Sequence, residues 1–245
     1  MSGETRLLPD RPIDGGGDSA ADTSAPRYAI YFVPPLSSAL ARFGETWFAD
    51  DLGARCGLPA ERAAALTESA RMYGFHGTLK PPMRLRSSQS PGALSDALHR
   101  FCNDRERFEV APLEVARLSG FLALRPSAPA PALDRLAADC VAGFDAFRAP
   151  PGEAELARRR RAGLSAAQEN LLRRWGYPYV FDEFRFHMTL STRLSNEAEA
   201  DALEATAREL AAPALAVPLP VDGLALSRQT APGAPFEVIE RFFFR

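Results

Sequence analysis

Short stretches rich in aromatic and β-branched residues alternate along this chain with segments whose apolar residues recur at helical spacing. The first such stretch, residues 28–33, ends at Pro34-Pro35, which is typical of a strand with a sharp end. The last one has few polar breaks, which predicts a strand buried on both faces. The predicted strands cover residues 28–33, 72–79, 108–116, 118–125, 184–191, 221–227 and 236–244.

Between these strands the apolar periodicity predicts helices. Ser165 followed by Gln168 indicates a capping box, and Gly176 suits the end of the helix that this box begins. Asn196 or its neighbour Ser195 is positioned to cap a later helix. The predicted helices cover residues 40–52, 91–101, 131–147, two short segments within 153–175, and 196–211.

The order of these elements contains a loose internal duplication. A strand, a helix, a second strand, a helix and two more strands are followed, after connecting helices, by a strand, a helix and two strands. Helices beside largely antiparallel strands indicate the α+β class. We therefore expect one bilobal domain over residues 27–245, with two pseudo-symmetric, largely antiparallel sheets lining a cleft and helices outside. Residues 1–26 are rich in Gly, Asp, Ser and Ala, and we expect a disordered tail there.

Each half of this duplication contains the same short motif, an apolar residue, His, any residue, Thr and an apolar residue. The first copy is residues 75–79 (FHGTL) and the second is residues 186–190 (FHMTL). Residues i and i+2 of a strand point to the same face. Each copy is therefore predicted to place an imidazole and a hydroxyl on one face, with its Phe and Leu in the core.

Composition narrows the classes of function. The formal net charge of −2 gives no excess of basic residues for long nucleic acid. No apolar segment is long enough to span a membrane, and no signal peptide is evident. Cys56, Cys102 and Cys140 are far apart, so we expect buried, reduced thiols in a cytoplasmic protein. We expect a monomer that needs no cofactor.

The two motifs supply the groups that acid–base chemistry requires. A neutral imidazole can accept a proton from a nucleophile while a protonated one donates to a leaving oxygen. The hydroxyls of Thr78 and Thr189 can donate to oxygens that gain charge in the transition state. His76, Thr78, His187 and Thr189 are therefore the predicted catalytic residues, and a phosphodiester fits four such groups. Which histidine is the acid and which is the base stays open.

Two other uses of the motifs also stay open. The cleft could bind a nucleotide or sugar phosphate without turning it over. A metal-dependent hydrolase is a further alternative, although no HExxH or HxH motif is present. The third histidine, His99, is interpreted as a half-exposed helix residue.

Residues beside the motifs are candidates for substrate binding. Lys80 shares the face of His76 and Thr78 if their strand continues unbroken. Tyr28 and Tyr31 have opposite parity on the first strand, so only one of them can face the cleft. Tyr73 adjoins the first motif, and three arginines also flank the motifs: Arg71, Arg84 and Arg193.

The paired motifs resemble those of the two-histidine (2H) phosphoesterase superfamily. Residues 27–32, 73–80 and 175–179 are similar to an uncharacterised branch that is often encoded beside phosphonate-utilisation genes. The resemblance implies a bilobal pseudo-twofold fold and metal-independent chemistry on cyclic phosphodiesters or 2′,5′-linked nucleotides. It implies that His76, Thr78, His187 and Thr189 are catalytic. The partner that it implies is a small cyclic nucleotide or sugar phosphate, within phosphonate metabolism.

Overall fold

The computed structural model describes residues 25–161 and 163–245, so the tail expected over residues 1–26 lies almost entirely outside the described residues. Seven strands form one sheet in the order β4-β5-β6-β2-β1-β8-β9, and β3 pairs with β7 in a second sheet. Every neighbouring pair is antiparallel. The strands are β1 (Arg27–Phe32), β2 (Gly77–Met83), β3 (Phe108–Val110), β4 (Leu113–Leu118), β5 (Phe121–Pro126), β6 (Met188–Thr189), β7 (Leu219–Val221), β8 (Gly223–Gln229) and β9 (Phe236–Phe243).

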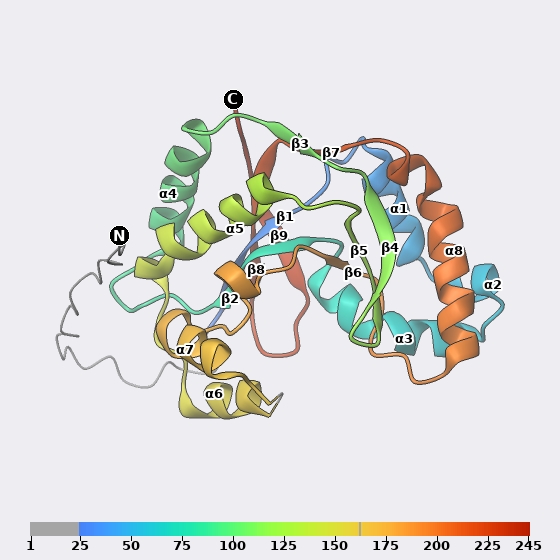
Figure 1. Cartoon of the computed structure of the whole chain (residues 1–245). Helices are drawn as coiled ribbons and strands as arrows, with labels where there is room; N and C mark the ends of the chain where they lie inside the picture. Colours follow the sequence, from blue (N-terminus) through green and yellow to red (C-terminus); the bar gives the residue numbers. More distant parts are fainter. Residues whose placement is uncertain (1–24, 162) are drawn as a thin grey trace, which may run out of the picture.

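The helices form two groups on either side of the sheet's centre (Figure 1). One group, α1, α2, α3 and α8, lies around β4 and β5, and the other, α4 to α7, lies around the end of β2. The α-helices are α1 (Ala39–Trp47), α2 (Leu52–Cys56), α3 (Ala60–Tyr73), α4 (Pro91–Asn103), α5 (Pro131–Gly143), α6 (Glu153–Arg160), α7 (Ala166–Trp175) and α8 (Glu197–Leu215), with 3₁₀ turns η1 (Asp145–Phe147) and η2 (Phe181–Glu183).

The predicted α+β class is confirmed, and the two expected sheets are the two halves of one sheet. Strands β4-β5-β6 form one half and β2-β1-β8-β9 form the other. The halves meet where β2 pairs with β6, through the single register pair Gly77↔Met188. Each half thus ends at a motif strand, and the joint lies between the two motifs.

Local sequence signals place several helix ends where they were expected. The capping box of Ser165 and Gln168 is formed, and Gly176 ends α7 with a left-handed backbone. The Asn196 side chain caps α8.

Cys56, Cys102 and Cys140 are buried free thiols, as expected. Within residues 25–161 and 163–245, no helix has both the length and the apolar character needed to cross a bilayer.

Other predicted elements differ from the structure. The helix over residues 40–52 is two helices, α1 and α2. The strand over 108–116 is divided at Ala111-Pro112, because proline supplies no ladder donor, and its parts join different sheets. The last strand is not buried on both faces: β9 is an edge strand that exposes Val238 and Ile239.

The motif strands are also shorter than predicted. Helix α3 continues to Tyr73, so β2 begins only at Gly77, and His76 lies just before the strand. The second motif strand contains only Met188 and Thr189. The apolar frame nevertheless lies as expected, since Leu79, Phe186 and Leu190 are buried in the main core.

Candidate active site

The register of β2 and β6 brings the two motifs together. Because Gly77 pairs with Met188 in antiparallel strands, His76 lies across from Thr189 and Thr78 lies across from His187. Gly77 and Met188 are buried, so the residues flanking them share the opposite face. The two imidazoles therefore occupy one diagonal of a four-residue cluster and the two hydroxyls the other.

Both imidazoles are held by the backbone in the same way. His76 Nδ1 lies 2.9 Å from the carbonyl oxygen of Gly74, and His187 Nδ1 lies 2.8 Å from the carbonyl oxygen of Arg185. A carbonyl oxygen can only accept a hydrogen bond, so each Nδ1 carries a proton. In its neutral form, each ring therefore presents an unprotonated Nε2 to its surroundings. In both motifs, the carbonyl oxygen that holds the imidazole thus belongs to the residue two positions before the histidine.

The surroundings of the two histidines differ. The His76 ring stacks on the Tyr31 ring at 3.8 Å between centroids, and Thr78 Oγ1 lies 3.0 Å from Nε2. Burial lowers the pKa of His76 to about 4, against a weaker rise from the Gly74 carbonyl, and His187 lowers it further. His187 lies near Phe121, at 5.7 Å between ring centroids. The enclosed His76 ring is thus neutral over most of the pH range.

The four predicted substrate-binding residues do not all reach this cluster. Tyr31 and Tyr73 do: the Tyr73 ring lies 6.2 Å from that of His76. Tyr28 packs in the main core, on the opposite face of β1 from Tyr31. The parity argument therefore holds, and Tyr31 is the one that faces the site.

The prediction that Lys80 shares the face of His76 and Thr78 is wrong. Tyr31 pairs with Thr78 but Ile30 pairs with Lys80, so β2 contains one extra residue at a β-bulge. The bulge reverses the alternation, and Lys80 points into the core on the face of Ile30. There it is 2% exposed and donates a hydrogen bond to the Val141 carbonyl of α5 at 2.8 Å. Burial lowers the pKa of Lys80 to about 8.

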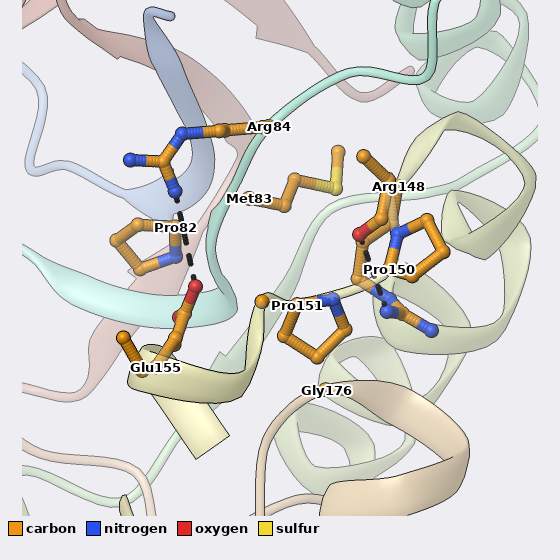
Figure 2. Close-up of a pocket in the computed structure, with 11 residues that line it drawn as sticks. Pro82, Met83, Arg84, Arg148, Pro150, Pro151, Glu155 and Gly176 are labelled. Atoms are coloured by element: carbon orange, nitrogen blue, oxygen red, sulfur yellow. Dashed lines mark hydrogen bonds and ion pairs between the residues drawn. The ribbon is translucent and has the colours of Figure 1, made fainter. Parts of the chain in front are cut away.

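The other flanking residues lie elsewhere. Arg71 contacts Asp50 and the Ala49 carbonyl, and Arg193 lies beside Gly120. Arg84 forms an ion pair with Glu155 at 3.8 Å in a pocket behind β2 (Figure 2). His99 is a half-exposed residue of α4, as interpreted, and its Nε2 lies 2.9 Å from a Glu240 carboxylate oxygen.

Sequence reasoning missed an aromatic residue that the structure brings beside Tyr31 and Tyr73. Phe236 of β9 packs beside Tyr31, at 6.0 Å between ring centroids, and Tyr177 follows α7. The Tyr73 ring stacks on that of Phe236 at 5.1 Å, and the Arg159 guanidinium lies 4.5 Å from the centre of the Tyr177 ring. The run Tyr177-Pro178-Tyr179 was a usable signal, because it holds two of the five tyrosines.

Two curated proteins are similar to this chain in sequence over most of its length. The chain is 40% identical over 233 residues to a protein from Janthinobacterium sp. (strain Marseille) named ribose 1,5-bisphosphate phosphokinase PhnN, with 90% of this chain and 51% of that protein covered. A protein of the same name from Laribacter hongkongensis (strain HLHK9) is 36% identical over 217 residues, covering 86% and 50%. The chain thus spans about half the length of the curated relatives it matches.

Two solved structures are also similar. Apo E. coli LigT has a TM-score of 0.41 at 16% identity, covering 90% of this chain and 99% of LigT. TT0787 of Thermus thermophilus has a TM-score of 0.44 at 18% identity, covering 89% and 98%. A family model described as "Protein of unknown function (DUF1045)" matches residues 78–237. The chain belongs to the DUF1045 family.

Proposed function

We propose that this protein is a metal-independent cyclic phosphodiesterase that opens a small cyclic phosphate. The observation that carries the proposal is the diagonal pair of imidazoles in unlike surroundings. An acid and a base that act together commonly have unlike environments, and here the Tyr31 ring covers His76 while His187 lies near Phe121. Hydrolysis of a phosphodiester uses all four groups. The base accepts a proton from the attacking water, the acid donates a proton to the leaving oxygen, and the threonines bind the two non-bridging oxygens.

The roles of the histidines follow from their surroundings. His76 is the base, because burial keeps its ring neutral and Nδ1–H is bound to Gly74. Its Nε2 accepts a proton as water attacks phosphorus, and protonated His187 donates one to the departing oxygen. In the free protein the Thr78 hydroxyl donates to His76 Nε2. The substrate frees this nitrogen when the hydroxyl turns to a phosphate oxygen.

The relatives support a ribose phosphate as the substrate class. Both relatives are named for a reaction of ribose 1,5-bisphosphate, and this chain matches about half of each of them. Two halves of one polypeptide commonly act on related compounds, so a ribose or nucleoside cyclic phosphate fits this half. The chain contains no GxxxxGK[ST] phosphate-binding motif, and we propose no kinase activity for it.

The test is turnover of a panel of cyclic phosphodiesters, followed by phosphorus NMR in the presence of EDTA. The panel includes nucleoside 2′,3′-cyclic phosphates and ribose 1,2-cyclic phosphate. We expect at least one cyclic signal to be replaced by that of a phosphate monoester. Tight binding of a cyclic phosphate that stays unchanged over long incubation would identify a binding protein instead. Loss of turnover in EDTA, restored by zinc, would identify a metal-dependent hydrolase.

The pH dependence of kcat/KM tests the assignment of the base. Activity requires neutral His76, so it should fall only as the pH drops through the pKa of about 4. Above this value the base is unprotonated, so His76 should not limit the rate. Circular dichroism at each pH separates titration from unfolding. An acid limb near the ordinary imidazole value of about 6.5 would contradict the assignment.

A further inference from the structure

Each motif is followed by a buried polar side chain, four residues after its histidine. Lys80 occupies this position after His76 and is 2% exposed, and Ser191 occupies it after His187 and is 1% exposed. Burial deprives a polar group of its hydrogen bonds to water, so such positions usually hold apolar residues. The internal duplication therefore extends past the motifs, to a position where burial alone would favour an apolar side chain.

Both polar residues lie at an irregularity of the strand pairing. Lys80 is part of the β-bulge of β2. After β6, the N–H groups of Leu190 and Ser191 both donate to the Leu122 carbonyl, at 2.8 and 3.3 Å. Two residues thus share one partner on β5, as in a β-bulge. Since a bulge changes the direction of the side chains around it, each motif threonine is followed directly by a point where the strand is re-aimed.

The Lys80 ammonium group joins the bulge of β2 to the end of helix α5. Its Nζ donates to the Val141 carbonyl at 2.8 Å and lies 3.9 Å from the Asp145 carboxylate of η1. Val141 lies in the last turn of α5, where carbonyl groups lack partners within the helix and the helix dipole favours a cation. Helix α5 contacts β2 (Figure 1). Lys80 therefore fastens the bulge to a helix that is distant in the sequence.

Ser191 has a comparable place after the second motif. Its hydroxyl accepts a hydrogen bond from the Leu122 N–H at 2.9 Å and donates one to the Thr192 carbonyl at 2.8 Å. The Leu190 carbonyl accepts a hydrogen bond from Trp47 Nε1 at 2.9 Å. Side chains thus supply bonds on this strand directly after its threonine, as Lys80 does on β2.

The cost of burying a cation indicates that Lys80 contributes position more than stability. Burial lowers the pKa of Lys80 to about 8, and the nearby Asp145 carboxylate only partly opposes this. Buried ionic groups add little net stability compared with apolar side chains of similar size, whereas their directional bonds can specify one arrangement. Asp145 has a second partner, Arg148, whose Nε lies 2.7 Å from it. Loss of the ammonium group would therefore leave this carboxylate paired.

We propose that Lys80 is a positioning residue, which fixes the bulge directly after Thr78 and so keeps the Thr78 hydroxyl directed to the site. Thr78 lies two residues before Lys80, and its Oγ1 is 3.0 Å from His76 Nε2. The bond to Val141 prevents the extra residue of β2 from moving to a neighbouring position, which would change the alternation at Thr78. The proposal rests on the proposed function for the role of Thr78 in the reaction.

A double-mutant cycle on the full chain tests this role, with the cyclic phosphodiester that the protein hydrolyses. Lys80→Met replaces the ammonium group with an apolar end of similar reach. We expect it to lower kcat about tenfold with little change in KM, because the Thr78 hydroxyl acts on charge that develops in the transition state. Thr78→Ala should lower kcat at least as far, and Lys80→Met should have no further effect in that background.

Controls separate positioning from stability. Thr206→Val removes a buried hydroxyl from α8 instead and should leave kcat near that of the wild type. An unchanged kcat in Lys80→Met, or independent effects of Lys80→Met and Thr78→Ala, would overturn the proposal. So would a Lys80→Met chain that circular dichroism shows to be unfolded, because Lys80 would then serve stability. Ser191→Ala with Thr189→Ala repeats the cycle at the second motif without removing a charge, and the same non-additivity is expected there.

The imidazole NMR signals give a readout that requires no turnover, since the chain has three histidines. In Lys80→Met the ring ¹⁵N signals of His76 should shift, because its Nε2 faces the Thr78 hydroxyl, whereas those of His99 on α4 should not. A shift in a protein that hydrolyses no cyclic phosphate would support the positioning role, and only the phosphodiesterase proposal would fall. Unshifted His76 signals would overturn the positioning role, even in an active phosphodiesterase.

Discussion

Replacing His76 or His187 with alanine is expected to lower kcat/KM on the true substrate by about 100-fold or more in each case, because each removes one proton transfer from the transition state. His99→Ala is the matched control. This third histidine contacts Glu240 of β9 and belongs to α4, so its loss should leave the rate near that of the wild type.

The leaving group distinguishes the two roles. If His187 is the acid, His187→Ala should lose little on a phosphodiester with a nitrophenol leaving group, which departs without protonation. His76→Ala should stay impaired on both kinds of substrate, because the attacking water still lacks its base. Steady-state rates on an alkyl and a nitrophenyl diester measure this difference. Recovery of His76→Ala and not of His187→Ala would reverse the assignment, and full activity of either variant would exclude the mechanism.

Gly77→Ala is expected to destabilise the fold by about 1–3 kcal/mol, the usual cost of overpacking a core. A Cβ on Gly77 would lie 2.3 Å from Phe186 Cε2 and 2.4 Å from Cζ, closer than atoms can approach. Phe186 is 6% exposed and packs in the main core, so its ring has little room to move. Gly77 also forms the register pair with Met188 that joins the two halves of the sheet. The activity of the variant should therefore fall together with its stability.

Urea unfolding measures this loss, with Gly152→Ala as the control, since a Cβ at Gly152 meets nothing within 4 Å. Combining Gly77→Ala with Phe186→Leu should recover part of the loss, because the smaller side chain vacates the position of the ring. If Gly77→Ala is as stable as Gly152→Ala, or if the two substitutions act additively, the close contact does not explain the glycine.

The sequence was sufficient for the part of the site that depends on strand alternation. Parity alone predicted that His76 and Thr78 share a face and that only one of Tyr28 and Tyr31 can join them. The same rule failed two residues later at Lys80, because a β-bulge reverses parity and depends on how two strands pair. Helix α3 was missed, since its buried face consists partly of small residues such as Ala63, Thr67 and Ala70.

The ring neighbours that make the surroundings of the two histidines unlike depend on how distant strands pair. Tyr31 of β1 stacks on His76, and Phe121 of β5 lies near His187. No local pattern in the sequence indicates either contact. Residues 158–161 are four consecutive arginines. The structure divides that run, with Arg159 over Tyr177 and Arg160 directed to Glu169.

The diagonal placement of the two imidazoles has a stereochemical consequence for the proposed reaction. A base and an acid on opposite corners of the cluster approach phosphorus from opposite sides, so water enters in line with the bond that breaks. Such a reaction has a single displacement and no covalent phosphoenzyme. We therefore expect inversion of configuration when a chiral cyclic phosphorothioate is opened in ¹⁸O-labelled water, and retention would require a nucleophile from the chain itself.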